Sequence, residues 1–188
     1  RHNGGTSSLR IILIGIGLSA LAGAATTLLT AFGDIRDVQR AMIWLAGSVY
    51  NADWAGVRML ALWLVAPMAM TMMASRQLDL IRFGDNAAQS LGQRVNLVRA
   101  LMMMLCTLLS GAAIAAAGLI GFVGLVAPHM ARRLIGPAHA GLLPVSALIG
   151  ATLVMAADFA GRTVVAPAQL PAGIVTALIG APFFAYLL

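Results

Sequence analysis

The stretch VNLVRALMMMLCTLLSGAAIAAAGLIGFVGLVAPHM, residues 95–130, decides the fold class of this chain. A helix that crosses the roughly 30 Å hydrocarbon core of a bilayer needs about 20 apolar residues. This stretch is too long for one such helix and slightly short for two, and glycines punctuate its second half. We therefore predict a tight reversal near Gly118 to Gly121, which joins membrane-spanning helices over Asn96–Ala117 and Ile120–Leu134.

Four further apolar stretches complete a set of six predicted spans. The last of them starts at a proline, where the missing N–H is not needed by a helix. The fold class is therefore an all-α membrane protein, a polytopic bundle of six transmembrane helices in a single domain over residues 1–188. The four additional spans are Leu9–Phe32, Val57–Ala74, Leu142–Ala157 and Pro171–Leu188.

The segment between the first two spans, residues 34–56, contains IWLAGS, Ile43 to Ser48, which is too short to cross a bilayer. Trp44, Tyr50 and Trp54 flank or belong to it, and such aromatic side chains are enriched at membrane–water interfaces. We predict a short helix that lies at that interface.

Composition agrees with a membrane solvent. Of the 188 residues, 61% are hydrophobic and 10% are charged, whereas soluble domains carry about 25% charged residues. This excludes a disordered chain, a nucleic-acid-binding domain and most soluble enzymes. All basic residues are Arg, all acidic residues are Asp, and the single Cys106 allows no intrachain disulfide and no cysteine-cluster metal site. The chain starts at Arg1 with no Met or signal peptide, so we expect a fragment or one segment of a longer polypeptide.

The arginines predict an orientation, because loops on the cytoplasmic side of a membrane protein carry more of them. With six spans, the side that holds both ends of the chain receives eight Arg and two Asp, and the other side receives four of each. Both ends of this segment are therefore predicted to be cytoplasmic, and the chain is predicted to lie in an inner membrane.

The longest connection on that side runs from Ser75 to Gln93. Gly84 breaks it, and Asp85-Asn86 can cap a short helix over Ala87–Leu91 that Gly92 closes. From the pattern alone, this helix is either a docking element for a soluble partner or an ordinary loop helix, and both interpretations stay open.

Asp158 and Arg162 are four residues apart with the acid first, which suits an ion pair on a helix surface. The pair either anchors the end of the fifth span locally, or it presents an exposed arginine to a carboxylate of an external partner.

His129 lies within a predicted span, and an ionisable group inside a membrane is a functional candidate. A lone histidine without a second ligand at suitable spacing is more often a packing residue. An alternative function remains: a membrane-embedded enzyme or a stand-alone secondary transporter that uses His129. The sequence offers no nucleophile with a paired base, so we predict no catalytic residues, no metal site and no cofactor.

Four ordered motifs resemble one family, the permease subunits of bacterial ABC importers for iron–siderophores, haem and cobalamin, often called FecCD. The likeness covers nearly the whole chain and includes GDNAAQSLG, Gly84 to Gly92. The motifs are GLIGFVGLVAPHMARRLIGP (Gly118 to Pro137), LLPVSALIGA (Leu142 to Ala151), AADFAGR (Ala156 to Arg162) and LPAGIVTALIGAPFF (Leu170 to Phe184).

The resemblance implies a fold, partners and roles. Family members have ten spans, and this chain is similar to the last six. It implies a second permease subunit or half, cytoplasmic ATPase subunits, a periplasmic substrate-binding protein, surrounding lipid and no nucleic acid. The ATPase would drive import of a metal chelate, and the permease itself would not be an enzyme.

The resemblance also assigns residues. Arg162 matches an arginine that docks the binding protein, and Gly15, Gly17 and Gly23 lie in a helix that lines the pathway. The chain departs from the family at Ala138-His139-Ala140, where Asp-His-Arg is usual. The residues implied for the cytoplasmic coupling helices that contact the ATPase are Gly84, Asp85, Ala88, Leu91 and Gly92.

Overall fold

The computed structural model describes residues 8–50, 52–164 and 170–187, and these residues form nine α-helices with their connections. They divide into two compact units, residues 1–43 and 44–188, which are described separately. Of the predicted boundaries, Leu188 lies outside the described residues, as does Arg1 of the charge count. The prediction of an all-helical membrane protein is confirmed, because the regular elements of the described residues are α-helices and several are long and apolar enough to cross a membrane.

The first unit consists of α1 (Ser8–Phe32) and most of α2 (Ile35–Leu45). α1 is apolar along its length, and its threonine hydroxyls donate back to carbonyl oxygens of the preceding turn, as Thr27 does to Gly23 over 3.0 Å. α2 is amphipathic and starts where Asp34 Oδ1 accepts the Arg36 N–H over 2.8 Å.

The interfacial helix predicted over Ile43–Ser48 is wrong in its bounds. α2 begins at Ile35 and ends at Leu45, so only the first three residues of IWLAGS are helical. The pattern of IRDVQRAMIWL places apolar residues on one face, which extends the helix backward, and Gly47 at φ +71° ends it.

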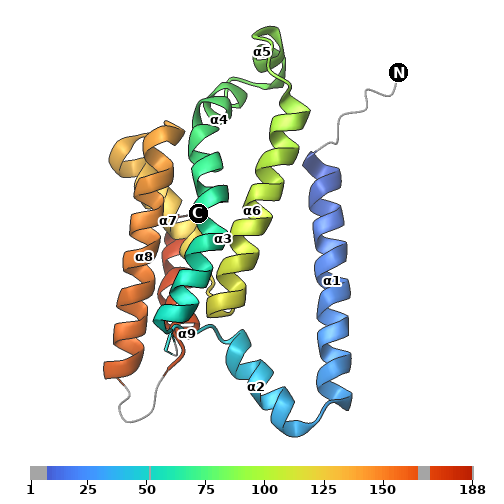
Figure 1. Ribbon diagram of the computed structural model, residues 1–188, viewed down its shortest axis with the longest axis vertical. Helices are drawn as coiled ribbons and strands as arrows, with labels where there is room; N and C mark the ends of the chain where they lie inside the picture. Colours follow the sequence, from blue (N-terminus) through green and yellow to red (C-terminus); the bar gives the residue numbers. More distant parts are fainter. Residues whose placement is uncertain (1–7, 51, 165–169, 188) are drawn as a thin grey trace. The chain divides into compact units, whose positions relative to one another are not determined.

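In the second unit, α3 (Trp54–Met73) and α6 (Val95–Ala117) lie side by side (Figure 1). α3 begins three residues before the predicted span because Asp53 Oδ1 caps it by accepting the Gly56 N–H over 2.8 Å. The core of this pair is a cluster of buried apolar side chains: Ala74, Val98, Met102 and Leu105.

Two short helices follow α3 at one end of this unit, α4 (Ser75–Ile81) and α5 (Asp85–Ser90) (Figure 1). The sequence predicted α5 but not α4. The remaining helices, α7 (Val123–Ile135), α8 (His139–Thr163) and α9 (Ala172–Leu187), pack against one another.

The reversal predicted between the third and fourth spans is confirmed, because α6 ends at Ala117 and α7 begins at Val123. A close backbone junction fixes it. A Cβ at Gly118, where φ is +71°, would collide with the carbonyl oxygen of Trp44, and one at Gly173 would collide with that of Ala46. Since only glycine fits at these contacts, they bring the end of α2, the reversal and the start of α9 together.

Four helices are long and apolar enough to cross a membrane: α1, α3, α6 and α8. The other two predicted spans are shorter than expected, since α7 has 13 residues and α9 has 16. α8 is longer than predicted, starting three residues before Leu142 and ending six residues after Ala157. The described part of the chain is therefore a multi-pass membrane protein with four clear spans.

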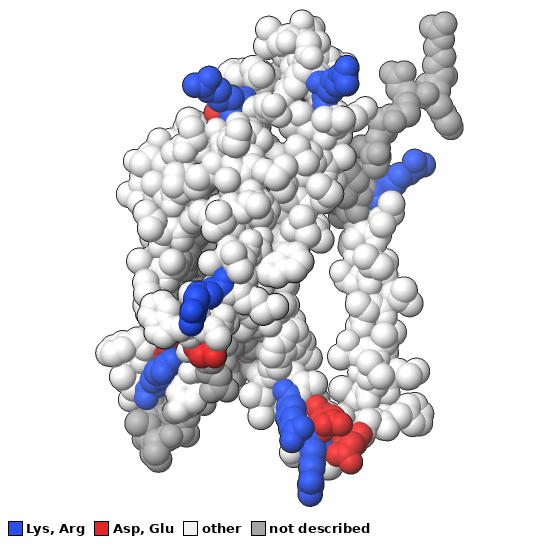
Figure 2. Space-filling view, viewed as in Figure 1, with Lys and Arg blue, Asp and Glu red and all other residues white. Residues whose placement is uncertain are grey.

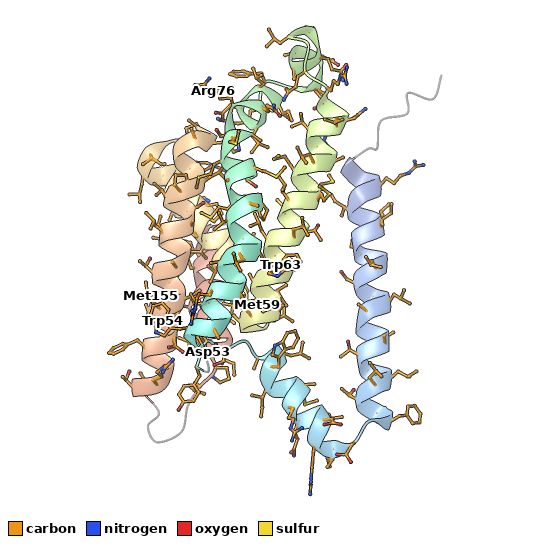
Figure 3. All side chains as sticks on the ribbon, viewed as in Figure 1. Asp53, Trp54, Met59, Trp63, Arg76 and Met155 are labelled. Atoms are coloured by element: carbon orange, nitrogen blue, oxygen red, sulfur yellow. The ribbon has the colours of Figure 1, made fainter. Side chains whose placement is uncertain are left out.

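Charged side chains gather toward the ends of the second unit, with a broad uncharged band between them (Figure 2). Trp54 and Arg76 mark these opposite ends, at the start of α3 and just after its last turn (Figure 3). This distribution is what a bilayer requires, because charges are costly in its hydrocarbon core.

Candidate functional site

The segment from α4 to Gly92 contains all five residues that the sequence assigned to coupling. Gly84, at φ +102°, separates α4 from α5, and Gly92, at φ +82°, follows the end of α5 as predicted. Ala88 is fully buried, whereas Leu91 is 70% exposed. The segment thus has an inner face that packs on its own unit and an apolar side chain that faces outward.

Asp85 does not cap a helix over Ala87–Leu91, and that prediction is wrong. It is the first residue of α5, and the residue before the helix is Gly84, which has no side chain to cap with. Its carboxylate instead accepts two hydrogen bonds from Arg99 Nη2, over 3.0 and 3.1 Å. A charged residue 14 positions away competes better than a cap, since charge-assisted bonds are the stronger ones. The pair ties α5 to α6.

A second polar contact ties α4 to the start of α8. Asp79 Oδ1 accepts the backbone N–H of His139 over 3.1 Å and lies 2.6 Å from Nδ1 of its ring. The side-chain hydrogen bond from His139 lowers the pKa of Asp79, and the backbone bond and the nearby positive charges act in the same direction against burial. Arg82 adds a bond from Nη1 to the carbonyl oxygen of Pro137 over 2.8 Å.

At the other end of α8, Arg162 is held on two sides. Its Nε and Nη2 both donate to Asp158 Oδ2 over 2.7 Å, which confirms the ion pair expected from the spacing. Its guanidinium carbon lies 4.9 Å from the centre of the Tyr50 ring. The two contacts leave Nη1 free of these partners and fix the plane of the group. The local-anchor interpretation is therefore correct as far as it goes, and it does not exclude an external partner.

A groove of about 650 Å³ runs along this end of α8. Apolar side chains line most of it, and Asp158 and Arg162 provide its polar end. The lining residues are Val49, Val123, Gly150, Ala151, Val154, Met155, Asp158, Phe159 and Arg162.

Gly15, Gly17 and Gly23, the residues assigned to the pathway, all lie in α1. A Cβ added at any of them would meet nothing within 4 Å, so no close contact in the described residues requires glycine there. The structure leaves their assigned role as a prediction.

His129 is part of α7, and its Nε2 is buried without a hydrogen-bond partner among the residues described. In the same residues, no group of three His, Cys, Asp or Glu side chains could hold a metal ion. The enzyme alternative required a second polar group facing His129, and the described residues supply none that bonds to Nε2.

Sequence reasoning missed three residues of these clusters: Asp79, Arg99 and Tyr50. His139 was named only as part of the turn, residues 138–140, that departs from the family. Their partners are 14 to 112 positions away in the chain, so no local spacing signals the contacts. The one sign available in the sequence was the departure from the family at Ala138, where Asp is usual; that this residue directly precedes α8 is seen only in the structure.

Comparison with known proteins gives a consistent picture. The sequence matches the model of the FecCD transport family over residues 1–188. It is 44% identical over 187 residues to the probable siderophore transport system permease protein YfhA of Bacillus subtilis (strain 168), covering 100% of this chain and 54% of that protein. It is 45% identical over 184 residues to the achromobactin transport system permease protein CbrC of Dickeya dadantii (strain 3937), covering 98% of this chain and 53% of that one.

A solved structure is similar as well. It is an ABC transporter assigned to the metal-chelate type, in an inward-facing conformation, with a TM-score of 0.91 and 34% sequence identity. The match covers 96% of this chain and 59% of that one. This chain thus spans about half the length of the curated relatives that it matches.

Proposed function

This chain belongs to the FecCD transport family, and on that premise we propose that it is the C-terminal part of a permease in an ATP-driven importer of iron–siderophores or related metal chelates. The observation that carries the proposal is the match of the whole chain to this family and to permeases of siderophore transport systems. The permease moves its cargo without covalent chemistry, and a partner subunit hydrolyses ATP.

In this proposal residues 1–188 form one transmembrane domain, equivalent to the last six of ten spans. α7 and α9 complete the six despite their length. The non-helical backbone between α6 and α7 then lies at membrane depth, which is tolerated only where protein surrounds it. Its close contacts with Trp44 and Gly47 support this arrangement.

The α4–α5 end of the second unit faces the cytoplasm, together with both ends of the chain. The arginine count supports this orientation, since Arg76, Arg82, Arg94 and Arg99 belong to or border the α4–α5 segment. The Arg162 end then faces the periplasm.

The α4–α5 segment docks on the ATPase. Ala88 and the Asp85–Arg99 pair hold α5 to the transmembrane helices, and Leu91 projects outward. An exposed leucine on an anchored helix suits insertion into an apolar groove of a partner. Because the helix is anchored, movement of that partner is passed to the permease rather than absorbed by a loose loop.

Arg162 docks the substrate-binding protein. The Arg162 side chain is 42% exposed, and its contacts with Asp158 and Tyr50 fix the orientation of the guanidinium. An exposed arginine in a fixed orientation suits a carboxylate acceptor. The exposed apolar helix α1, with Gly15, Gly17 and Gly23, lines the pathway beside a second permease subunit or half, because glycine lets another backbone or a bulky cargo approach closely.

The test uses the full-length permease co-expressed with its ATPase. Leu91→Asp introduces a charge at the docking side chain and is expected to abolish co-purification of the ATPase and chelate uptake. Leu91→Met keeps an apolar side chain of similar volume and should retain both. Full retention of the ATPase by Leu91→Asp would contradict the docking role.

A further inference from the structure

α8 begins without a cap from its own sequence. The first N–H groups of a helix lack partners within it, and the side chain just before the helix often supplies an acceptor. Here that residue is Ala138, which has none. Asp79 of α4, 60 residues earlier, supplies the acceptor by binding the His139 N–H.

Asp79 and Arg82, the residue that directly follows α4, make further bonds at this point. Asp79 Oδ1 also binds the His139 ring over 2.6 Å, and Arg82 donates to the Pro137 carbonyl oxygen over 2.8 Å. Arg82 directly follows the last residue of α4, and its Nη1 lies 3.8 Å from Asp79 Oδ1, so the two side chains also support each other. The Asp79 and His139 side chains are only 30% and 21% exposed, which limits screening of the contact by salt. α4 and the residue that follows it therefore bind residues on both sides of the start of α8.

α8 then continues as one helix to Thr163, with Pro144 near its start as the internal proline. At 1.5 Å per residue, Arg162 lies about 35 Å along the axis from His139. α4 is in turn connected to the end of α5, because Gln93 Nε2, just beyond α5, donates to the Gln77 carbonyl oxygen over 2.9 Å. The contacts form a continuous series from the α4–α5 segment to the far end of α8.

We propose that Asp79 and His139 are positioning residues that join α4 to α8, so that displacement of the α4–α5 segment by the ATPase moves α8 and with it Arg162. The inference rests on the proposed function, since it needs a partner that moves the segment. It adds a specific connection: the Asp79 carboxylate of α4 caps the start of α8 and at the same time links the two helices.

A cap and a link can be separated by mutation. Asp79→Ala removes both. Adding Ala138→Asp to that variant restores a cap within α8 but does not restore the contact of Asp79 with α8, and only the Arg82 bond to Pro137 remains. His139→Ala keeps the backbone N–H that donates to the Asp79 carboxylate and removes the ring contact, so it leaves the cap in place and weakens the link alone. Asp53→Ala is the matched control, because Asp53 caps α3 from its own sequence without joining two elements.

The readout is movement at the outer end of α8 in the full-length permease–ATPase complex. In a Cys106→Ser background, Thr163→Cys is labelled with a maleimide, without nucleotide and with ATP plus vanadate. We expect nucleotide to change the labelling rate about fivefold or more, in the range of ordinary coupling factors. Asp79→Ala and His139→Ala should lose most of that change, while the ATPase still co-purifies and Asp53→Ala responds normally.

The double variant decides the matter. We expect Asp79→Ala/Ala138→Asp to recover thermal stability but not the nucleotide response. Recovery of the response would overturn the proposal, because a cap alone would then suffice. A normal nucleotide response in His139→Ala would also overturn the proposal, and this test remains valid if Asp79→Ala does not fold. So would the absence of a nucleotide response in the permease that carries only Cys106→Ser and Thr163→Cys. Loss of the ATPase from the unaltered permease would instead contradict the proposed function.

Discussion

The guanidinium carbon of Arg162 lies 4.9 Å from the centre of the Tyr50 ring, and these two residues are 112 positions apart in the chain. The ring covers one face of the cation while Asp158 takes two of its N–H groups from the edge. Arg162 is therefore presented in one orientation before any partner arrives, which lowers the ordering cost of binding.

The first prediction concerns this presentation. Tyr50→Leu removes the aromatic face and should weaken binding of the substrate-binding protein about two- to fivefold, corresponding to about 0.5–1 kcal/mol for an exposed cation–π contact. Tyr50→Phe keeps the ring and should bind as the native permease does. Surface plasmon resonance with the permease in nanodiscs measures the affinity of each variant for the binding protein. Equal affinities of Tyr50→Leu and Tyr50→Phe would show that the ring does not contribute to docking.

The second prediction concerns the charge of Arg162. Arg162→Glu places a third carboxyl beside Asp158 and any acidic partner, so docking of the binding protein should fall by at least tenfold. Arg162→Lys keeps the charge but loses the planar guanidinium, so its affinity for the binding protein should lie between those of the native permease and Arg162→Glu. Basal ATP hydrolysis should not change in either variant, and unaltered docking of Arg162→Glu would show that this arginine serves only as a local anchor.

The sequence predicts the four long spans and the local Asp158–Arg162 pair well, and it predicts the long-range polar contacts poorly. The third span was predicted as Asn96–Ala117 and is Val95–Ala117, because apolar length and a helix-ending glycine are local properties. The interaction of Asp79 with His139 depends on a packing arrangement that no spacing encodes. Asp85 shows the same limit: a local cap was the simplest prediction, and a distant arginine took its carboxylate.

The glycine junction gives a third prediction. Gly118→Ala brings a Cβ onto the Trp44 carbonyl oxygen and demands a φ of +71° from alanine, so it should cost about 1–3 kcal/mol. Gly111→Ala, in the middle of α6 with open space around it, should be neutral or stabilising by about 0.5–1 kcal/mol. Thermal unfolding of the two variants in one detergent compares them; similar melting temperatures would mean that the junction can relax.

The fourth prediction is a pH dependence. The pKa of Asp79 is lower in the folded protein than in the unfolded chain, chiefly because His139 donates a side-chain hydrogen bond to it. The folded state thus binds fewer protons, and the stabilisation is present above the unfolded pKa and is lost as pH falls through the folded one. The melting-temperature difference between the native protein and Asp79→Asn should therefore become smaller as the pH is lowered from 5 to 3. This range includes the ordinary aspartate pKa of about 3.9, which is the value for the unfolded chain.

In the same experiment, Asp37→Asn serves as the control, because its pair with Arg40 is long, at 3.7 Å, and both side chains are highly exposed. It should change the melting temperature little at any of these pH values. A difference for Asp79→Asn that stays constant or grows on acidification would contradict the charged form of the contact.

Coupling to the ATPase requires that the α4–α5 segment lies on the cytoplasmic side, and one labelling experiment tests this directly. In a Cys106→Ser background, the exposed Ser90→Cys is treated with a membrane-impermeant maleimide in spheroplasts and in inside-out vesicles. A cytoplasmic segment should be labelled only in inside-out vesicles, and it should be protected there when the ATPase is bound. Labelling from the outside of spheroplasts, or none from either side, would contradict a cytoplasmic location.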